Sequence, residues 1–310
     1  MRRQIHGILL LDKPAQMTSN GALQKVKRLF QAKKAGHTGS LDPIATGMLP
    51  ICFGEATKFS QFLLESDKVY QVVAKLGEKT TTGDTEGEVV AVKPLVNINE
   101  ARIKEVASAF LGEIEQVPPM FSAIKHQGRP LYELARRGIE IKREPRKVHI
   151  FSLTVAAFEG DQLTFEVHCS KGTYIRTLVE DIGEVLGCGA HVIGLRRLSV
   201  TPYANALMYS LATLEQLADT RGQEGLLASL LPIETAVQVY PAVKLSTSAT
   251  FYLRMGQSVR APFALTSPLV RLFADDARFL GVGEVMPDGR VKPHRLLSSQ
   301  DHYAIAKATA

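Results

Sequence analysis

The stretch Ala35-Gly-His-Thr-Gly-Ser-Leu-Asp-Pro-Ile-Ala-Thr-Gly47 combines three glycines, a histidine, a carboxylate and a proline within thirteen residues. Glycine permits backbone conformations that other residues avoid, and it lets a ligand approach the main chain closely. Pro43 fixes its own φ angle and biases Asp42 towards an extended conformation. We therefore expect Asp42 to stand on a stiff loop, where its carboxylate is held ready for catalysis.

The same residues also have a structural interpretation, because glycine-rich segments and Asp-Pro dipeptides are common in turns. The stretch lacks the G-x-x-x-x-G-K-[ST] and G-x-G-x-x-G spacings, so it does not predict a nucleotide-binding loop. On residue chemistry alone, Asp42 fits a structural turn slightly better than a catalytic site.

The composition is that of an ordinary soluble globular protein, with 45% hydrophobic and 22% charged residues among 310. This length suffices for one large domain or two. The longest early apolar run covers residues 8–11 and is too short for a signal-peptide core or a membrane span. The three cysteines, Cys52, Cys169 and Cys188, lack metal-ligand spacing and predict reduced, buried thiols in a cytoplasmic protein.

Positive charge is concentrated in two segments of the chain. Residues 1–37 carry a net charge of +7 and residues 118–147 carry +5; the whole chain carries +6, which leaves −6 on the remainder. Neutralising phosphates supplies much of the affinity for nucleic acid, so this segregation favours a polyanionic partner. Two solvated basic surfaces without RNA would produce the same pattern.

Hydrophobic periodicity and capping residues predict an α+β chain. Strands are expected over residues 6–11, 48–53, 69–76, 163–169 and 191–198, with residues 89–92 as the partner of 69–76. Helices are expected over residues 20–32, 57–64, 99–111 and 208–232, and a further helix should end at Gly187. From about residue 244, short strands and turns predict a small all-β module, a barrel.

Residues 118–147 differ in kind from their surroundings. Prolines stand near both ends, and the aromatic residues Phe121 and Tyr132 are interleaved with basic ones; residues 131–137 have a helical pattern. We interpret the segment as an insertion that grips RNA and is ordered partly by its partner. A basic surface hairpin without a ligand is the structural alternative.

The segment Gly36–Gly47 closely resembles the catalytic motif of the TruB-type tRNA pseudouridine synthases. The flanking segments, Gly7-Ile-Leu-Leu-Leu-Asp-Lys-Pro14 and Leu49-Pro-Ile-Cys-Phe-Gly-Glu-Ala-Thr-Lys58, match the same family. The resemblance implies isomerisation of uridine 55 in the T loop of tRNA to pseudouridine, with base flipping. It also implies a catalytic domain over residues 1–243, with a central mixed, mainly antiparallel sheet, and a PUA-like RNA-binding β-barrel over 244–310.

The resemblance makes Asp42 the essential carboxylate, which attacks either the sugar or the base. Arg176 is implied as its partner, because a nearby cation favours the charged form and a guanidinium binds a carboxylate in a bidentate manner. The alternation of Tyr174 and Arg176 puts both side chains on one face, which favours a shared site. The reaction requires no metal and no cofactor.

Several further residues of this chain match positions of the family's substrate pocket. Tyr70 would pack on the uracil and move a proton in the final step, while Tyr174 and Leu195 would line the pocket. His37 would insert into the T loop and hold the target base extruded. Two lysines are implied as supporting residues that stiffen the loop or touch RNA: Lys13 and Lys58.

We expect a monomeric cytoplasmic protein that binds the T-arm stem-loop of tRNA without a membrane or a nucleotide cofactor. A tRNA-folding chaperone without catalysis would share the basic segments, but it would not need Asp42 and Tyr70. A methyltransferase would need an adenosyl-cofactor loop, and no persuasive one is found. A glycosidase usually needs a second carboxylate near the first, which the Asp42 stretch does not supply.

Overall fold

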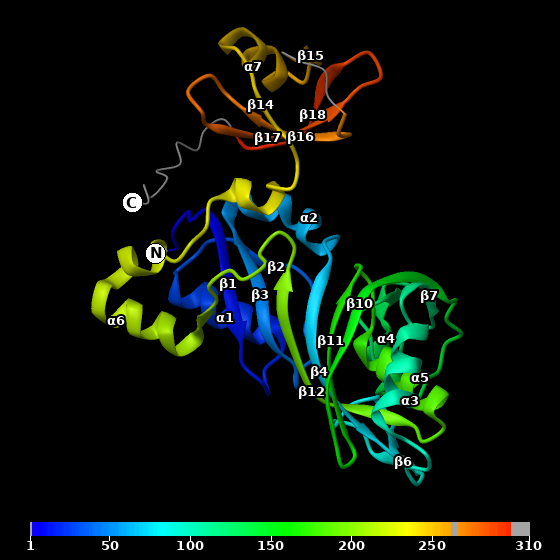
Figure 1. The fold of residues 1–310 in the computed structure, drawn as a ribbon. Helices are drawn as coiled ribbons and strands as arrows, with labels where there is room; N and C mark the ends of the chain where they lie inside the picture. The colour runs from blue at the N-terminus through cyan, green and yellow to red at the C-terminus, as the bar shows by residue number, and fades with distance from the viewer. Residues whose placement is uncertain (1, 262–265, 299–310) are drawn as a thin grey trace. The chain divides into compact units, whose positions relative to one another are not determined.

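The computed structural model (Figure 1) describes residues 2–261 and 266–298. The chain divides into two compact units. The first unit comprises Met1–Leu41, Met48–Glu65 and Thr201–Ala310, and the second comprises Asp42–Gly47 and Ser66–Val200. The conspicuous glycine-rich stretch therefore contributes to both units.

The second unit is built on a sheet in which the strand order is β12-β4-β11-β10-β7. These strands are β12 Ala190–Val200, β4 Lys68–Leu76, β11 Gln162–Cys169, β10 Arg146–Glu159 and β7 Gly112–Gln116. Their pairings are all antiparallel. The start of β3 (Thr46–Phe53) adds a parallel pairing to β12, which confirms the prediction of a mixed, mainly antiparallel sheet.

Two helices cover one face of this sheet, α3 (Glu100–Ala109) on β10 and α5 (Ile175–Leu186) on β12. Asn99 caps α3 by accepting a hydrogen bond from the Arg102 amide at 3.0 Å. Gly187 ends α5 with a φ of 84°, a conformation that glycine adopts without strain. In β4 and β11 alternate residues are buried, so each strand presents one apolar face to the core.

The predicted pairing of residues 89–92 with residues 69–76 is wrong. The strand β6 (Val89–Val92) instead pairs with β5 (Glu78–Thr80) in a separate two-stranded ribbon. Both edges of β4 are occupied by β11 and β12. All four residues of β6 are apolar, yet its valines are 54–73% exposed, because the strand pairs with β5 outside the central sheet.

In the first unit, β1 (Gly7–Lys13) lies between β3 and the short β13 (Tyr209–Ser210), and β2 (Ala35–His37) pairs with β3. The helix α1 (Ser19–Leu29) starts at Thr18, whose hydroxyl accepts from the Gly21 amide at 3.0 Å. Four more helical elements come before the C-terminal part of this unit: η1 Gly54–Phe59, α2 Ser60–Leu64, α6 Leu211–Leu227 and η2 Ile233–Val237.

The C-terminal part of this unit contains a five-stranded sheet with its own apolar core. Its strands are β14 Ala242–Lys244, β15 Val259–Arg260, β16 Leu269–Phe273, β17 Phe279–Val285 and β18 Arg290–Leu296. A helix that periodicity did not predict, α7 (Thr247–Arg254), contributes Leu253 to that core. Residues 262–265 and 299–310 of the predicted module lie outside the described residues.

The insertion forms a small hairpin of β8 (Lys125–His126) and β9 (Arg129–Pro130), followed by α4 (Leu131–Ala135). The short predicted helix is thus present. All three cysteines are buried and unpaired, as predicted. No helix within the described residues is long and apolar enough to cross a membrane.

Candidate active site

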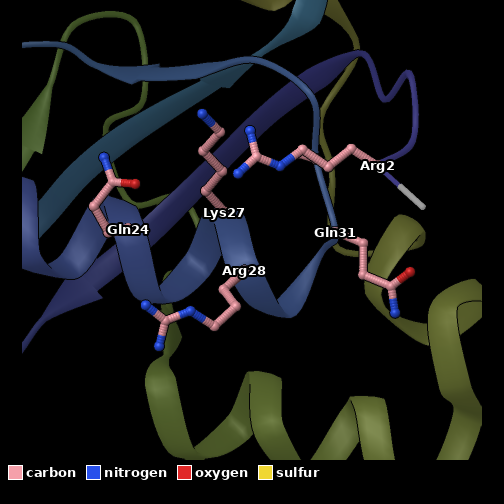
Figure 2. Close-up of a pocket in the computed structure, with 6 residues that line it drawn as sticks. Arg2, Gln24, Lys27, Arg28 and Gln31 are labelled. Atoms are coloured by element: carbon pink, nitrogen blue, oxygen red, sulfur yellow. The ribbon is translucent and has the colours of Figure 1, made fainter.

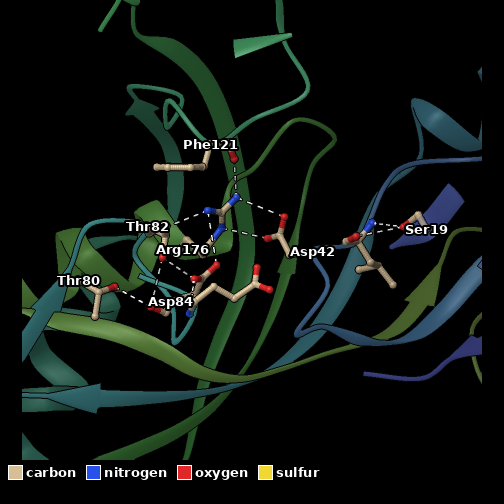
Figure 3. A network of polar contacts seen from close by, with 9 residues as sticks. Ser19, Asp42, Thr80, Thr82, Asp84, Phe121 and Arg176 are labelled. Atoms are coloured by element: carbon tan, nitrogen blue, oxygen red, sulfur yellow. Dashed lines mark hydrogen bonds and ion pairs between the residues drawn. The ribbon is translucent and has the colours of Figure 1, made fainter. Parts of the chain in front are cut away.

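An ion pair between Asp42 and Arg176 lies in the second unit (Figure 3). The Arg176 Nε atom is 3.0 Å from Asp42 Oδ2, and Nη2 donates to Oδ1 at 3.3 Å. The side chain of Arg176 is 6% exposed, whereas that of Asp42 is 37% exposed. The guanidinium is therefore an internal support with bidentate geometry, and the carboxylate remains accessible to a ligand.

The remaining faces of the Arg176 guanidinium are also occupied. Its Nη1 donates to the Thr82 carbonyl at 2.9 Å, and its Nη2 donates to the Phe121 carbonyl at 2.7 Å. The Asp84 Oδ2 atom lies 3.6 Å from Nη1. These contacts come from segments far apart in sequence, so the position of the arginine is determined by the tertiary fold.

Asp84 is a residue that sequence reasoning missed. Its side chain is 2% exposed and accepts hydrogen bonds from Thr82 Oγ1 at 2.5 Å and from the Glu86 amide at 3.0 Å. The segment is attached to β12, because the Val192 amide donates to the Gly83 carbonyl at 3.0 Å. A polar stretch rich in threonine and glycine resembles a surface turn, so its burial has no signal in the sequence.

The prediction that Tyr174 and Arg176 alternate as in a strand is wrong, because α5 begins at Ile175 and Arg176 is already helical. Tyr174 is the N-cap of α5, and Arg176 lies in the first turn. The strand β11 ends at Cys169, after which Gly172 turns the chain with a φ of 81°. The Gln116 side chain fixes the helix start: its Oε1 accepts from the Tyr174 amide at 3.0 Å, and its Nε2 donates to the Tyr174 carbonyl at 3.3 Å.

Tyr70 and Leu195 lie on neighbouring strands of the same unit. Tyr70 is 7% exposed and stands opposite Arg197 in the β4–β12 register, while Leu195 is 8% exposed and stands opposite Val72. Burial raises the pKa of the Tyr70 phenol, and the adjacent Arg197 cation opposes this change. Burial also raises the pKa of the Tyr174 phenol. Both phenols therefore stay protonated at neutral pH and can donate hydrogen bonds.

The backbone conformation of Gly47 and its contact with β12 explain why the motif has glycine at this position. It has a φ of 99°, and a Cβ atom at this position would lie 2.2 Å from the Arg197 carbonyl oxygen. The close approach allows the Arg197–Gly47 pairing of β12 with β3. The Ala45 amide donates to the Asp42 carbonyl at 3.1 Å and closes the turn between the catalytic candidate and this strand.

Three further candidates lie in the first unit. His37 is half-buried on β2, opposite Ile51 of β3. Lys13 is fully buried, and its Nζ donates to the carbonyls of Pro14 and Met17 at 2.8 and 2.7 Å. Lys58 Nζ lies 2.6 Å from Glu55 Oε2 and donates to Ser298 Oγ at 2.9 Å. Both lysines therefore hold chain segments together within this unit.

The second unit thus supplies an accessible carboxylate and a buried cation that holds it, and, besides burial, the charge of this carboxylate contributes to the raised pKa values of the Tyr70 and Tyr174 phenols. Such a carboxylate can act as a nucleophile or stabilise positive charge on a reacting carbon. A flipped base needs a flat stacking surface and partners for its polar edge. These are groups that nucleotide chemistry requires.

Comparison with known proteins agrees with this geometry. Residues 27–175 match the model of the TruB family pseudouridylate synthase N-terminal domain. Residues 176–238 match the tRNA pseudouridylate synthase B C-terminal domain, and residues 241–297 match the C-terminal model of pseudouridine synthase II TruB.

Full-length relatives are similar over almost the whole chain. The tRNA pseudouridine synthase B of Coxiella burnetii (strain RSA 493 / Nine Mile phase I) is 53% identical over 299 residues, covering 96% of this chain and 97% of that protein. The protein of the same name from Tolumonas auensis is 54% identical over 302 residues, covering 95% and 93%.

Solved structures confirm the predicted pseudouridine synthase fold. A chain of a Cbf5-Nop10-Gar1 complex superposes with a TM-score of 0.73 at 27% identity, covering 94% of this chain and 83% of that chain. A chain of an H/ACA RNP bound to a substrate RNA has the same fold, with a TM-score of 0.74 at 23% identity, covering 96% and 86%. This chain belongs to the TruB family of pseudouridine synthases.

Proposed function

We propose that this protein isomerises uridine 55 in the T loop of tRNA to pseudouridine. The observation that carries the proposal is the accessible Asp42 carboxylate, held in a bidentate pair by the buried Arg176 within the family motif. The relatives named tRNA pseudouridine synthase B, 53% identical to this chain, support the substrate class.

The reaction rearranges the nucleoside without net gain or loss of atoms. The bond between N1 of uracil and C1′ of ribose breaks, the base rotates, and C5 bonds to C1′. The proton on C5 is then lost, and N1 acquires one. Asp42 attacks either C1′ of the sugar or C6 of the base, and Arg176 aligns it and stabilises its charge before and after the attack.

The flipped uracil would lie beside three apolar or aromatic side chains. Tyr70 stacks on the base and moves a proton in the last step, while Tyr174 and Leu195 line the pocket. The partial exposure of Asp42 and the low exposure of Tyr70 and Leu195 support a site that is reached by one extruded base. His37 inserts into the T loop, and Lys13 and Lys58 support the loops near it.

The basic insertion over residues 118–147 grips the T-arm. The guanidinium of Arg136 lies over the ring of Tyr132, 5.5 Å from its centroid, and Tyr132 is 37% exposed. An aromatic ring backed by a cation is a suitable surface for RNA. The protein acts as a cytoplasmic monomer, with a catalytic domain over residues 1–243 and a PUA-like domain over 244–310 that adds RNA contacts.

Release of tritium from C5-labelled uridine in an unmodified T-arm stem-loop tests the proposal. The parent protein should release tritium, and the Asp42→Asn variant should release none while it binds the same RNA. The variant Asp161→Asn is the matched control, because that carboxylate is 47% exposed and directly precedes Gln162, the first residue of β11, at the end opposite Cys169.

A tRNA-folding chaperone without catalysis predicts a different result. Parent and Asp42→Asn variant would then bind the stem-loop equally, and neither would release tritium. Equal release by both would retain the enzyme and refute the role given to Asp42.

A further inference from the structure

A basic hollow of about 480 Å³ lies in the first unit, along α1 (Figure 2). This volume is within the range of about 300–1,000 Å³ that small-molecule sites have. Its lining contains three cations, two amides and no carboxylate: Arg2, Gln24, Lys27, Arg28, Gln31 and Ala32. Gln24, Lys27 and Arg28 are spaced at i, i+3 and i+4, so they share one face of the helix.

The fold holds Arg2 beside this face. The Arg3 amide donates to the Gln31 carbonyl at 2.7 Å, and the Lys33 amide donates to the Arg3 carbonyl at 2.8 Å. The Arg3 guanidinium donates to Gln223 Oε1 of α6 at 3.0 Å. The backbone that carries Arg2 is thus fixed alongside residues 31–33, and the Arg2 side chain lies next to that of Lys27 (Figure 2).

Basic residues in the last turn of a helix often donate hydrogen bonds to its terminal carbonyl oxygens. Here those carbonyls already have partners. The carbonyls of Val26, Lys27 and Arg28 each accept from a backbone amide at 3.0 Å, and that of Leu29 accepts from Gln223 Nε2 at 3.1 Å. Within the described part of the chain, the side chains of Arg2, Lys27 and Arg28 form no ion pair and no hydrogen bond. Capping therefore does not account for them.

We propose that this hollow binds backbone phosphates of the tRNA, next to the segment that His37 contacts. The proposal rests on the function proposed above. Guanidinium and ammonium groups without carboxylate partners are the groups that bind phosphate, and amides add neutral donors.

Continuity of charge favours a nucleic acid over a small anion. The exposed Lys33 and Lys34 follow the hollow directly and lead to β2, where His37 lies. His37 is five positions after Ala32, a span of at most about 18 Å even when fully extended. An RNA strand whose loop contacts His37 can therefore reach the hollow within a few nucleotides.

The salt dependence of tRNA binding tests this assignment in the full-length protein. The triple variant Arg2→Gln, Lys27→Gln, Arg28→Gln should lower the slope of log Kd against log salt by roughly 2–3, since each lost phosphate contact removes about 1. Between 50 and 200 mM salt, its affinity should then fall roughly 16- to 64-fold less than that of the parent.

A control triple variant, Lys25→Gln, Lys93→Gln, Arg221→Gln, removes the same charge at exposed positions that do not line the hollow. It should keep the parental slope to within about 0.5. An unchanged slope in the first variant, or an equal change in both, overturns the assignment. If the first variant has a lowered Tm, the exposed pair Arg2→Gln, Arg28→Gln replaces it, with an expected change of about 2.

Two further measurements distinguish a small-anion site from an RNA site, and a wrong assignment of the hollow from a wrong assignment of the reaction. Inorganic phosphate is the probe for a small-anion site: if it stabilises the parent but not the triple variant, while the tRNA slope is unchanged, the RNA assignment is wrong. Tritium release is measured in parallel. If the parent releases no tritium but the salt dependence of its tRNA binding depends on the three cations, the proposed reaction is refuted and the assignment of the hollow to RNA phosphates is supported.

Discussion

The buried carboxylate of Asp84 should control the rate of the reaction without touching the RNA. Its Oδ2 atom lies 3.6 Å from Arg176 Nη1, and its side chain is 2% exposed. Replacing Asp84 with Asn keeps the size of the side chain and one acceptor oxygen for Thr82 and the Glu86 amide. It removes the negative charge that holds the guanidinium on the side away from Asp42.

The magnitude follows from that distance. Two unit charges 3.6 Å apart attract by roughly 4–5 kcal/mol at an effective dielectric constant of about 20. The amide oxygen of Asn retains part of this attraction. We therefore expect the aligned conformation of Arg176 to be about 2–3 kcal/mol less stable in the variant than in the parent. If the aligned guanidinium is required only as Asp42 reacts, the rate falls about 100-fold.

Single-turnover tritium release at saturating protein measures this rate directly. The Asp84→Asn variant should react about 100-fold more slowly, and its Kd for the T-arm stem-loop should stay within about 3-fold of the parent. The Asp161→Asn control should match the parent in both. A single-turnover rate within about 3-fold of the parent would show that Asp84 does not position Arg176.

Three other predictions concern the same unit. In a denaturant titration, Gly47→Ala should lower the free energy of unfolding by about 2 kcal/mol or more, because its Cβ would lie 2.2 Å from the Arg197 carbonyl oxygen. The control Gly36→Ala has open space at its Cβ, so it should lower the free energy of unfolding by less than about 1 kcal/mol. Arg176→Lys should slow tritium release at least about 10-fold at unchanged RNA affinity, since an ammonium cannot reproduce the bidentate pair; a parental rate would contradict this. Burial and the Arg197 cation lower the pKa of Lys68 from 10.5 to about 8, so the unfolded chain binds more protons between these values. The stability of the parent should therefore rise by about 3 kcal/mol relative to Lys68→Met from pH 8 to 10.5, and a constant difference would refute it.

Local signals in the sequence predicted much of the secondary structure. The cap at Thr18, the stop at Gly187 and the alternation in β11 depend on residues close to one another in the chain, and short-range chemistry is what a single sequence displays. The motif around Asp42 and its partner Arg176 came from the resemblance to the family, and the structure brings the two side chains together.

Strand partners and buried polar contacts were decided by the tertiary structure. Periodicity tells which face of β4 is buried, but it does not tell which strands lie beside it, so the pairing with residues 89–92 was mistaken. Asp84 and Gln116 look like surface residues in the sequence. They acquire their roles because folding brings them to Arg176 and to the Tyr174 backbone.

The sequence by itself thus determined the α+β class, most of the helices, several strands of the central sheet, and a carboxylate on a glycine-rich loop. Only the tertiary structure decided how that carboxylate is supported, since hydrogen bonds between distant segments depend on geometry that no local pattern encodes. The same holds for Gly47, whose necessity follows from its contact with Arg197, 150 residues later in the chain.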